Sequence, residues 1–158
     1  SYFSSGGKLY AVYKTSPHTV MEVDGEAVTM MPSTPFPAWR WGEPRGGASP
    51  VLVNGEWWHW FHSRYDHGGR ARYTTGVYVF EDAPPFRVIR YVPEPIMVAD
   101  PATNRHDQPG GHNYCETIFT CGAVLRGDRF ILSSGEHDRR SLIHGVGREE
   151  LERRMVRL

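Results

Sequence analysis

Polar side chains recur at matching places along the chain, where three β-rich runs end. Ser16-Pro17-His18 follows the first run, His62-Ser63-Arg64-Tyr65 the second, and Gly135-Glu136-His137-Asp138 the third. Imidazole, guanidinium, phenol and carboxylate groups together can hold an anion or hydrogen-bond the hydroxyls of a sugar. If the three ends converge, one pocket would be lined by His18, His62, Arg64, Tyr65 and Asp138. The alternative is that these are ordinary turn residues at strand ends.

A second group precedes the strands rather than following them. Arg45-Gly46-Gly47 opens one segment, and Gly110 to Glu116 opens the next. Glycine lets the backbone approach a ligand closely, and the planar fork of arginine suits phosphate or a sugar carboxylate. Arg45 and Glu116 therefore join the predicted binding residues. The open alternative is a sharp turn beside a solvated arginine.

Other chemistries find less support in the residue spacing. His106, His112, His137 and His144 show no zinc-binding spacing such as HExxH, so no metal site is predicted. No GxSxG segment supports a serine nucleophile. Cys115 and Cys121 fall on the same face of a strand-like segment, too far apart to bond to each other, and we expect free thiols in the core.

A weak internal repeat indicates the elements that must position these residues. The repeated pattern is a turn glycine, one polar residue and then a β-rich run. It starts at Gly7, Gly55 and Gly127. A third strand follows each run, at 18–23, 70–80 and 140–147, and a fourth at 27–31, 86–92 and 155–158. We predict an all-β chain of about three four-stranded antiparallel units, bounded at 1–44, 45–104 and 105–158.

The central strand predicts how these units pack. One face of Trp57–His62 carries Trp57, His59 and Phe61, and the other carries Trp58, Trp60 and His62. Neither face is polar, as expected for a sheet covered on both sides rather than one with a wet face. The only helical pattern, 148–154, is short and charged, and is expected to form at most a turn on the surface.

Composition excludes some partners. Lysine plus arginine equals aspartate plus glutamate at 18 each, which argues against a broad nucleic-acid surface. No apolar run approaches the roughly 20 residues that span a bilayer, so no membrane partner is predicted. Two free cysteines favour a reducing compartment, and we expect the cytoplasm.

The quoted motifs, taken in order, resemble a known family. Arg45-Gly46-Gly47-Ala48-Ser49-Pro50-Val51, a hairpin, Trp57 to Phe61 and then His62-Ser63 resemble the five-bladed β-propeller glycosidases and phosphorylases that act on β-mannosides, glycoside hydrolase family 130. Leu9 to Asp24 resembles the preceding blade of those proteins, and Phe119 to Asp138 resembles their last blade. The resemblance implies that this chain is a partial β-propeller corresponding to the C-terminal blades.

The resemblance also implies a function. It implies inverting chemistry in a central channel without a metal or cofactor, with inorganic phosphate as a potential co-substrate. His62 matches the family's channel histidine, and Asp138 matches its late sugar-binding acid. The family's general acid lies in an Asp-Pro-Arg motif that has no match here, because Asp100-Pro101 is followed by Ala102. The catalytic residue is therefore unknown, and Ser63, where the phosphorylases carry glycine, puts phosphate in question.

Two functional hypotheses follow. In the first, the chain supplies the acceptor or phosphate side of a glycoside hydrolase or phosphorylase that further blades complete. In the second, it is a non-enzymatic carbohydrate-binding module, a half propeller that self-associates. Both give carbohydrate as the ligand. A stand-alone half propeller would leave open blade faces, through which the chain could form a homo-oligomer.

Overall fold

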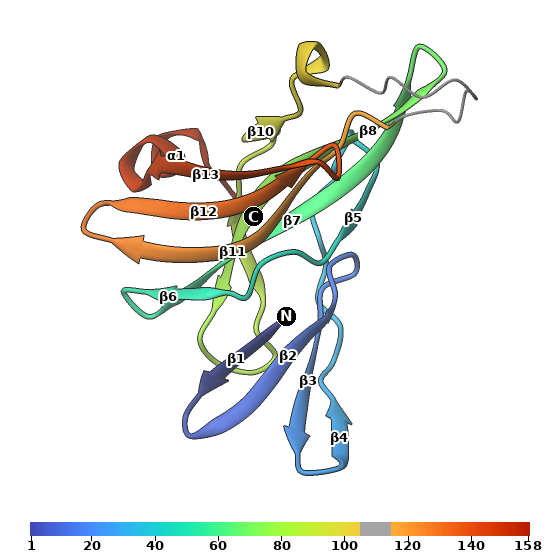
Figure 1. Cartoon of the computed structure of the whole chain (residues 1–158). Helices are drawn as coiled ribbons and strands as arrows, with labels where there is room; N and C mark the ends of the chain where they lie inside the picture. The colour runs from blue at the N-terminus through green and yellow to red at the C-terminus, as the bar shows by residue number, and fades with distance from the viewer. Residues whose placement is uncertain (105–114) are drawn as a thin grey trace.

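The computed structural model describes residues 1–104 and 115–158. The predicted Gly110 to Tyr114 segment, together with His106 and His112, lies outside the described residues. The described chain is almost entirely β-structure, arranged as three antiparallel sheets that follow one another along the sequence (Figure 1). The predicted all-β class is confirmed.

The first sheet is a four-stranded meander, ordered β1-β2-β3-β4. Its strands are β1 Tyr2–Ser5, β2 Lys8–Lys14, β3 Thr19–Asp24 and β4 Ala27–Met30. The sequence analysis missed β1. Its signal is the Gly6-Gly7 turn, where φ angles of 56° and 78° close a tight hairpin onto β2.

The middle sheet is built on the long hairpin of β7 Glu56–His67 and β8 Arg70–Glu81, with 12 residues in each strand. β5 Glu43–Arg45 and β6 Val51–Val53 pair with successive parts of β7. β9 Val88–Tyr91 and β10 Met97–Val98 both pair with β8.

The third sheet has three strands, not the four that we predicted. They are β11 Ile118–Arg126, β12 Arg129–Glu136 and β13 Arg140–Gly147. The expected fourth strand, β14 Val156–Arg157, pairs with β9 and so extends the middle sheet. The cause is α1 Arg148–Arg154, which turns the chain back because Leu151 is fully buried in the core. A purely surface turn of helix was the wrong expectation.

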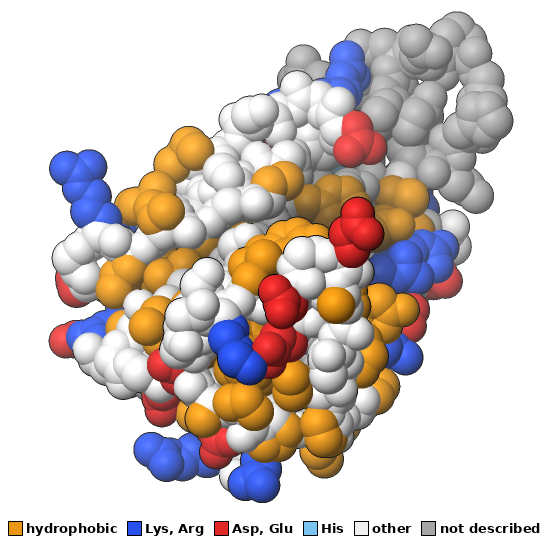
Figure 2. Space-filling view, turned by 90° about the horizontal axis from the view of Figure 1, so that it is seen from below, with side chains coloured by type: hydrophobic (Ala, Val, Ile, Leu, Met, Phe, Trp, Pro, Cys, Tyr) orange, Lys and Arg blue, Asp and Glu red, His pale blue; other side chains and the backbone are white. Residues whose placement is uncertain are grey.

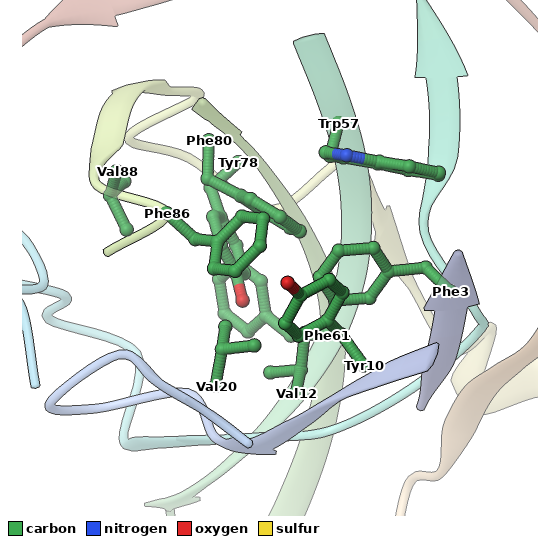
Figure 3. Packing of buried hydrophobic residues seen from close by; sticks show 10 residues of the cluster. All are labelled: Phe3, Tyr10, Val12, Val20, Trp57, Phe61, Tyr78, Phe80, Phe86 and Val88. Atoms are coloured by element: carbon green, nitrogen blue, oxygen red, sulfur yellow. The ribbon is translucent and has the colours of Figure 1, made fainter. Parts of the chain in front are cut away.

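Both faces of the middle sheet are buried, as predicted. Trp57, Phe61, Tyr78 and Phe80 pack on the first sheet, where Figure 3 shows Phe3 and Tyr10 among them. The opposite face forms a second core with the third sheet and α1. That core includes Trp58, Trp60, Val77, Val79, Phe130, Leu132 and Leu151. The middle sheet is therefore held between its two neighbours.

Two smaller expectations concern cysteines and membranes. Cys115 and Cys121 are both free, but Cys115 is half-buried and Cys121 is exposed, so neither lies in the core as expected. In the described part of the chain, no helix is long and apolar enough to cross a membrane.

Candidate functional site

Three of the predicted binding residues share one face of the middle sheet. In the β5–β7 ladder Arg45 lies opposite His62, and Glu43 lies opposite Arg64. Directly opposed residues of an antiparallel pair project on the same side, so Arg45, His62 and Arg64 form a cationic row at this end of β7. Arg45 pairs with Glu43 at 3.2 Å and Arg64 pairs with Asp66 at 3.2 Å, both at the surface.

Aromatic rings flank the imidazole in this row. The ring centroid of His62 lies 4.8 Å from that of Phe119 and 6.1 Å from that of Tyr73. Burial lowers the pKa of His62, and the charge of Arg45 lowers it further, while the Gly46 carbonyl opposes both. The site therefore offers a neutral imidazole at neutral pH beside two permanent cations.

A small hollow lies at the same end of the β7–β8 hairpin. Its volume is about 140 Å³, and its lining includes Tyr65, Arg72, Thr74 and Glu116. Residues alternate between the two faces along a strand, so Tyr65 and the opposed Arg72 face away from the cationic row. Tyr73 belongs to both places, because it borders the hollow and its ring lies near His62. The predicted residues thus occupy two neighbouring places rather than one.

The Arg72–Glu116 ion pair forms the polar part of the hollow. The Nε atom of Arg72 lies 2.7 Å from Oε2 of Glu116, and its Nη2 donates to Oε1 at 3.4 Å. Glu116 is held in place by its backbone, whose amide donates to Ala71 and whose carbonyl accepts from Tyr73. The carboxylate is almost fully buried, so its charge is compensated mainly by Arg72. Arg72 was missed by the sequence analysis, and its position opposite Tyr65 in the hairpin is the signal that would have found it.

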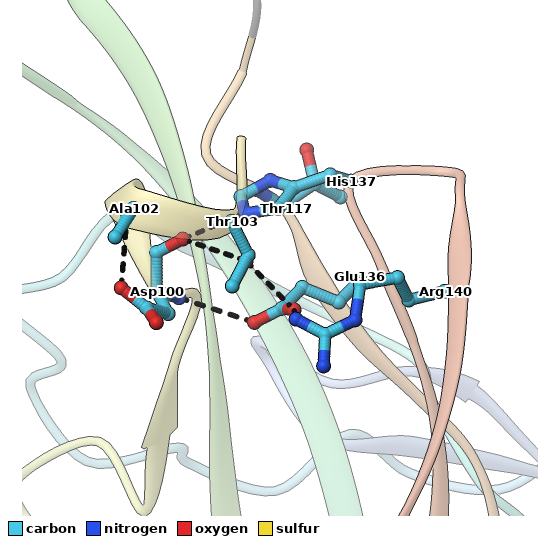
Figure 4. A network of polar contacts seen from close by, with 7 residues as sticks. All are labelled: Asp100, Ala102, Thr103, Thr117, Glu136, His137 and Arg140. Atoms are coloured by element: carbon cyan, nitrogen blue, oxygen red, sulfur yellow. Dashed lines mark hydrogen bonds and ion pairs between the residues drawn. The ribbon is translucent and has the colours of Figure 1, made fainter. Parts of the chain in front are cut away.

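A polar network ties the third sheet to the turn after β10 (Figure 4). Glu136 accepts hydrogen bonds from the Asp100 amide at 3.1 Å, from Thr103 at 3.0 Å and from Arg140 at 3.1 Å. The 3₁₀ turn η1 Pro101–Thr103 is fixed by these contacts. Pro101 also borders the hollow, so the network positions one of its walls.

His137 continues this network on the other side of Asp100. The Thr117 amide donates to Nδ1 of His137 at 3.3 Å, which assigns the proton to Nε2. That nitrogen then donates to the Asp100 carbonyl at 3.0 Å. His137 is buried, and it acts here as a brace between the third sheet and η1.

Two predicted residues lie elsewhere. Asp138 is exposed in the turn between β12 and β13, with a left-handed φ of 55°. His18 is fully buried between the first and middle sheets, where its ring lies 5.0 Å from that of Phe80. A fully buried side chain cannot line an open pocket. His18 and His62 hold equivalent places in the repeat, but they do not line one shared surface.

His18 belongs instead to a buried polar triad. Its Nδ1 lies 3.0 Å from the Tyr78 hydroxyl, which also lies 2.8 Å from Nδ1 of His59. Burial lowers the pKa of His18 to about 4 and that of His59 well below its ordinary value. Burial likewise raises the pKa of Tyr78 well above its ordinary value. All three groups are therefore neutral at pH 7.

Among the described residues, no group of three or more histidine, cysteine, aspartate or glutamate side chains is placed to hold a metal ion.

Comparison with solved structures shows how the three sheets belong together. The chain superposes on the β-1,2-mannobiose phosphorylase of Listeria innocua, solved in complex with β-1,2-mannobiose, with a TM-score of 0.69 and 16% sequence identity. The superposition covers 96% of this chain and 44% of that one. The fold is a partial β-propeller. Its three sheets are blades, and the chain spans less than half the length of the phosphorylase. No family model matches the sequence, and no curated protein matches it.

Proposed function

We propose that this partial propeller binds carbohydrate at the end of the β7–β8 hairpin, with β-mannosides as the ligand class. The observation that carries the proposal is the hollow with a buried carboxylate, an arginine and a tyrosine, beside the row of Arg45, His62 and Arg64. It lies in a fold similar over nearly its whole length to a β-1,2-mannobiose phosphorylase.

The chemistry of the hollow suits a sugar. A carboxylate such as Glu116 accepts hydrogen bonds from two neighbouring hydroxyls, and the donors of Arg72 complement ring and hydroxyl oxygens. Tyr65 adds a flat apolar surface with a polar tip. The volume of 140 Å³ is below that of a typical drug-sized site, so the hollow suits one sugar unit, with the rest of the ligand outside.

The second functional candidate, binding without catalysis, is favoured by the carboxylates. A general acid must carry a proton, yet Glu116 and Glu136 each hold an arginine at hydrogen-bond distance. Both carboxyl groups are engaged in ion pairs that organise their surroundings. We infer that this chain alone binds a glycoside without cleaving it, and that hydrolysis or phosphorolysis requires a general acid from further blades.

The two free cysteines suit the cytoplasm.

Titration calorimetry of the whole chain with β-1,2-mannobiose tests this proposal. Glu116→Gln keeps the shape but removes the charge, and we expect it to weaken binding about tenfold, or about 1.4 kcal/mol. His62→Ala is expected to weaken it by a similar factor. Glu26→Gln, in an exposed turn of the first blade, is the matched control and should bind as wild type does.

Two results would argue against the proposal. One is the absence of binding heat at millimolar mannobiose with the wild-type chain. The other is unchanged affinity in both Glu116→Gln and His62→Ala, with circular dichroism showing that each variant is folded.

A further inference from the structure

The outward face of the first blade carries two complete cross-strand rows that are apolar except for Ser4. One row runs Tyr2, Ala11, Met21, Met30 and the other Ser4, Leu9, Val23, Val28. Neither row contains a charged side chain. Val28 is 53% exposed and Met30 is 48% exposed, so the face is open to solvent. Figure 2, seen from the end of the molecule where this blade lies, shows hydrophobic side chains exposed between scattered charges.

The third blade has an open face at the other end of the chain. Its rows run Gly122, Ser133, Ile143 and Val124, Ile131, Gly145. Ile143 is 73% exposed and Val124 is 59% exposed. The Arg129 side chain lies at the margin, where it donates to the Gly145 carbonyl at 2.7 Å. The centre of this face is uncharged and mixes the small residues Gly122, Ser133 and Gly145 with valine and isoleucine.

The chain itself shows twice how such faces are covered. The first blade places Phe3, Tyr10 and Val12 on the middle blade, and the middle blade places Trp58 and Trp60 on Phe130 of the third. We call the face of a blade that points toward the next blade in the sequence its forward face, and the opposite face its backward face. In each case the forward face of one blade packs on the backward face of the next. The open face of the third blade is a forward face, and the open face of the first is a backward face.

The two open faces also complement each other in shape. The first-blade face presents large, flexible side chains in Leu9, Met21 and Met30. The third-blade face presents Gly122, Ser133 and Gly145 among three β-branched residues, Val124, Ile131 and Ile143. Large side chains on one sheet can fill the space that small ones leave on another. Two identical first-blade faces would instead oppose large side chains to large ones.

We propose that a second copy of this chain covers these faces head to tail, with the first blade of one copy packed on the third blade of the other. The contact is heterologous, because two different surfaces meet. It repeats the forward-to-backward packing already present inside the chain. An uncharged face of this kind, exposed on a monomer, marks an interaction surface.

Sedimentation velocity from 1 to 100 µM tests the pairing with two face-blocking variants. Val28→Glu charges the first-blade face, and Ile143→Glu charges the third-blade face, at positions exposed enough to leave folding intact. The wild-type chain is expected to associate with rising concentration, while each variant alone stays monomeric. An equimolar mixture of the variants should form a dimer and nothing larger, because each retains the one face that the other lacks.

Val98→Glu, exposed on β10 outside both faces, is the matched control and should associate as wild type does. Met30→Lys and Val124→Lys form a second pair, to be used if circular dichroism shows that the first pair is unfolded. A wild-type chain that is monomeric at 100 µM would overturn the proposal, as would self-association of Ile143→Glu or a mixture that stays monomeric.

Discussion

His18 and His59 come from different blades and meet at a single hydroxyl, that of Tyr78, which lies within 3.0 Å of a ring nitrogen of each. A hydroxyl has one proton, so it donates to one ring and accepts from the other. The two imidazoles must therefore carry their protons on different nitrogens. This triad joins the first and middle blades through polar contacts inside an otherwise apolar core.

Removal of the Tyr78 hydroxyl should destabilise the fold without a change in packing. Tyr78→Phe keeps the ring but leaves both histidine nitrogens without that partner, and we expect a loss of about 1–3 kcal/mol in the free energy of unfolding. Urea denaturation at pH 7 measures this loss. Tyr2→Phe, on an exposed side chain of the first blade, should change stability by less than about 0.5 kcal/mol. Equal stability of Tyr78→Phe and wild type would contradict this role for the triad.

The same histidines predict acid sensitivity. Burial depresses the folded-state pKa of His18 to about 4, while an unfolded histidine titrates near 6.5. Between those values the unfolded chain binds the proton and the folded chain does not, so stability falls as the pH falls. We expect a slope of up to about 1.4 kcal/mol per pH unit for each such histidine.

Urea denaturation at several pH values from 7 to 4.5 measures that slope. His18→Gln should flatten it, because a non-titrating group replaces the histidine. His67→Gln, in the exposed tip of the β7–β8 hairpin, should leave the slope unchanged. A wild-type slope equal to that of His18→Gln would show that His18 is not the titrating group.

The packing of the middle blade predicts a steric effect at Gly76. A methyl group there would lie 2.3 Å from Cζ of Phe61, which is itself fully buried. Gly76→Ala should therefore lower the free energy of unfolding by about 1–3 kcal/mol through overpacking. Gly135→Ala is the matched control, since no atom lies within 4 Å of its added methyl group. Thermal denaturation of both variants decides the matter, and equal melting temperatures would contradict the packing described.

The sequence predicted the middle blade well because its signals are local. Asn54-Gly55 marks a turn, and the apolar residues on both faces of Trp57–His62 require cover on both sides. β1, which was not predicted, has only four residues and lies at the N-terminal end of the chain. β14 was assigned to the wrong blade because its partner depends on where α1 buries Leu151, which is a tertiary contact.

The candidate site was predicted in part. The cross-strand register places Arg45, His62 and Arg64 together, and the alternation of strand faces explains why Tyr65 lies on the other side. Equal positions in the repeat did not predict the burial of His18, because its ring lies between two blades, against Phe80 and the Tyr78 hydroxyl. Repeat position predicts where a residue lies along a strand, but not what packs over it.

The turn that borders the hollow should open more readily when Glu136 is replaced. Glu136 fixes the Asp100 amide and Thr103, so Glu136→Gln should loosen the turn by roughly 1–3 kcal/mol. Hydrogen exchange of the Asp100 amide should then be faster, while exchange in β7 stays as in the wild type. Glu43→Gln, an exposed partner of Arg45, is the control and should leave the Asp100 amide unaffected. Unchanged exchange in Glu136→Gln would show that the turn is held by other contacts.

The cationic row allows phosphate to be distinguished from sugar as its ligand. Arg45 and Arg64 are surface guanidiniums that suit an anion, whereas a neutral sugar gains little from their charge. If the row binds an anion, Arg45→Ala and Arg64→Ala should each weaken inorganic phosphate binding about threefold and should affect mannobiose affinity less. Phosphate affinity of the wild type should also fall between 20 and 300 mM NaCl, because exposed charges are screened over roughly 10 Å at 0.1 M salt. Arg87→Ala, at an exposed position just before β9, serves as the charge-matched control. Two results would exclude the row as a phosphate site. One is equal phosphate affinity of both row variants and the wild type, and the other is the absence of binding heat at 20 mM NaCl. Sugar binding in the hollow is tested separately by Glu116→Gln.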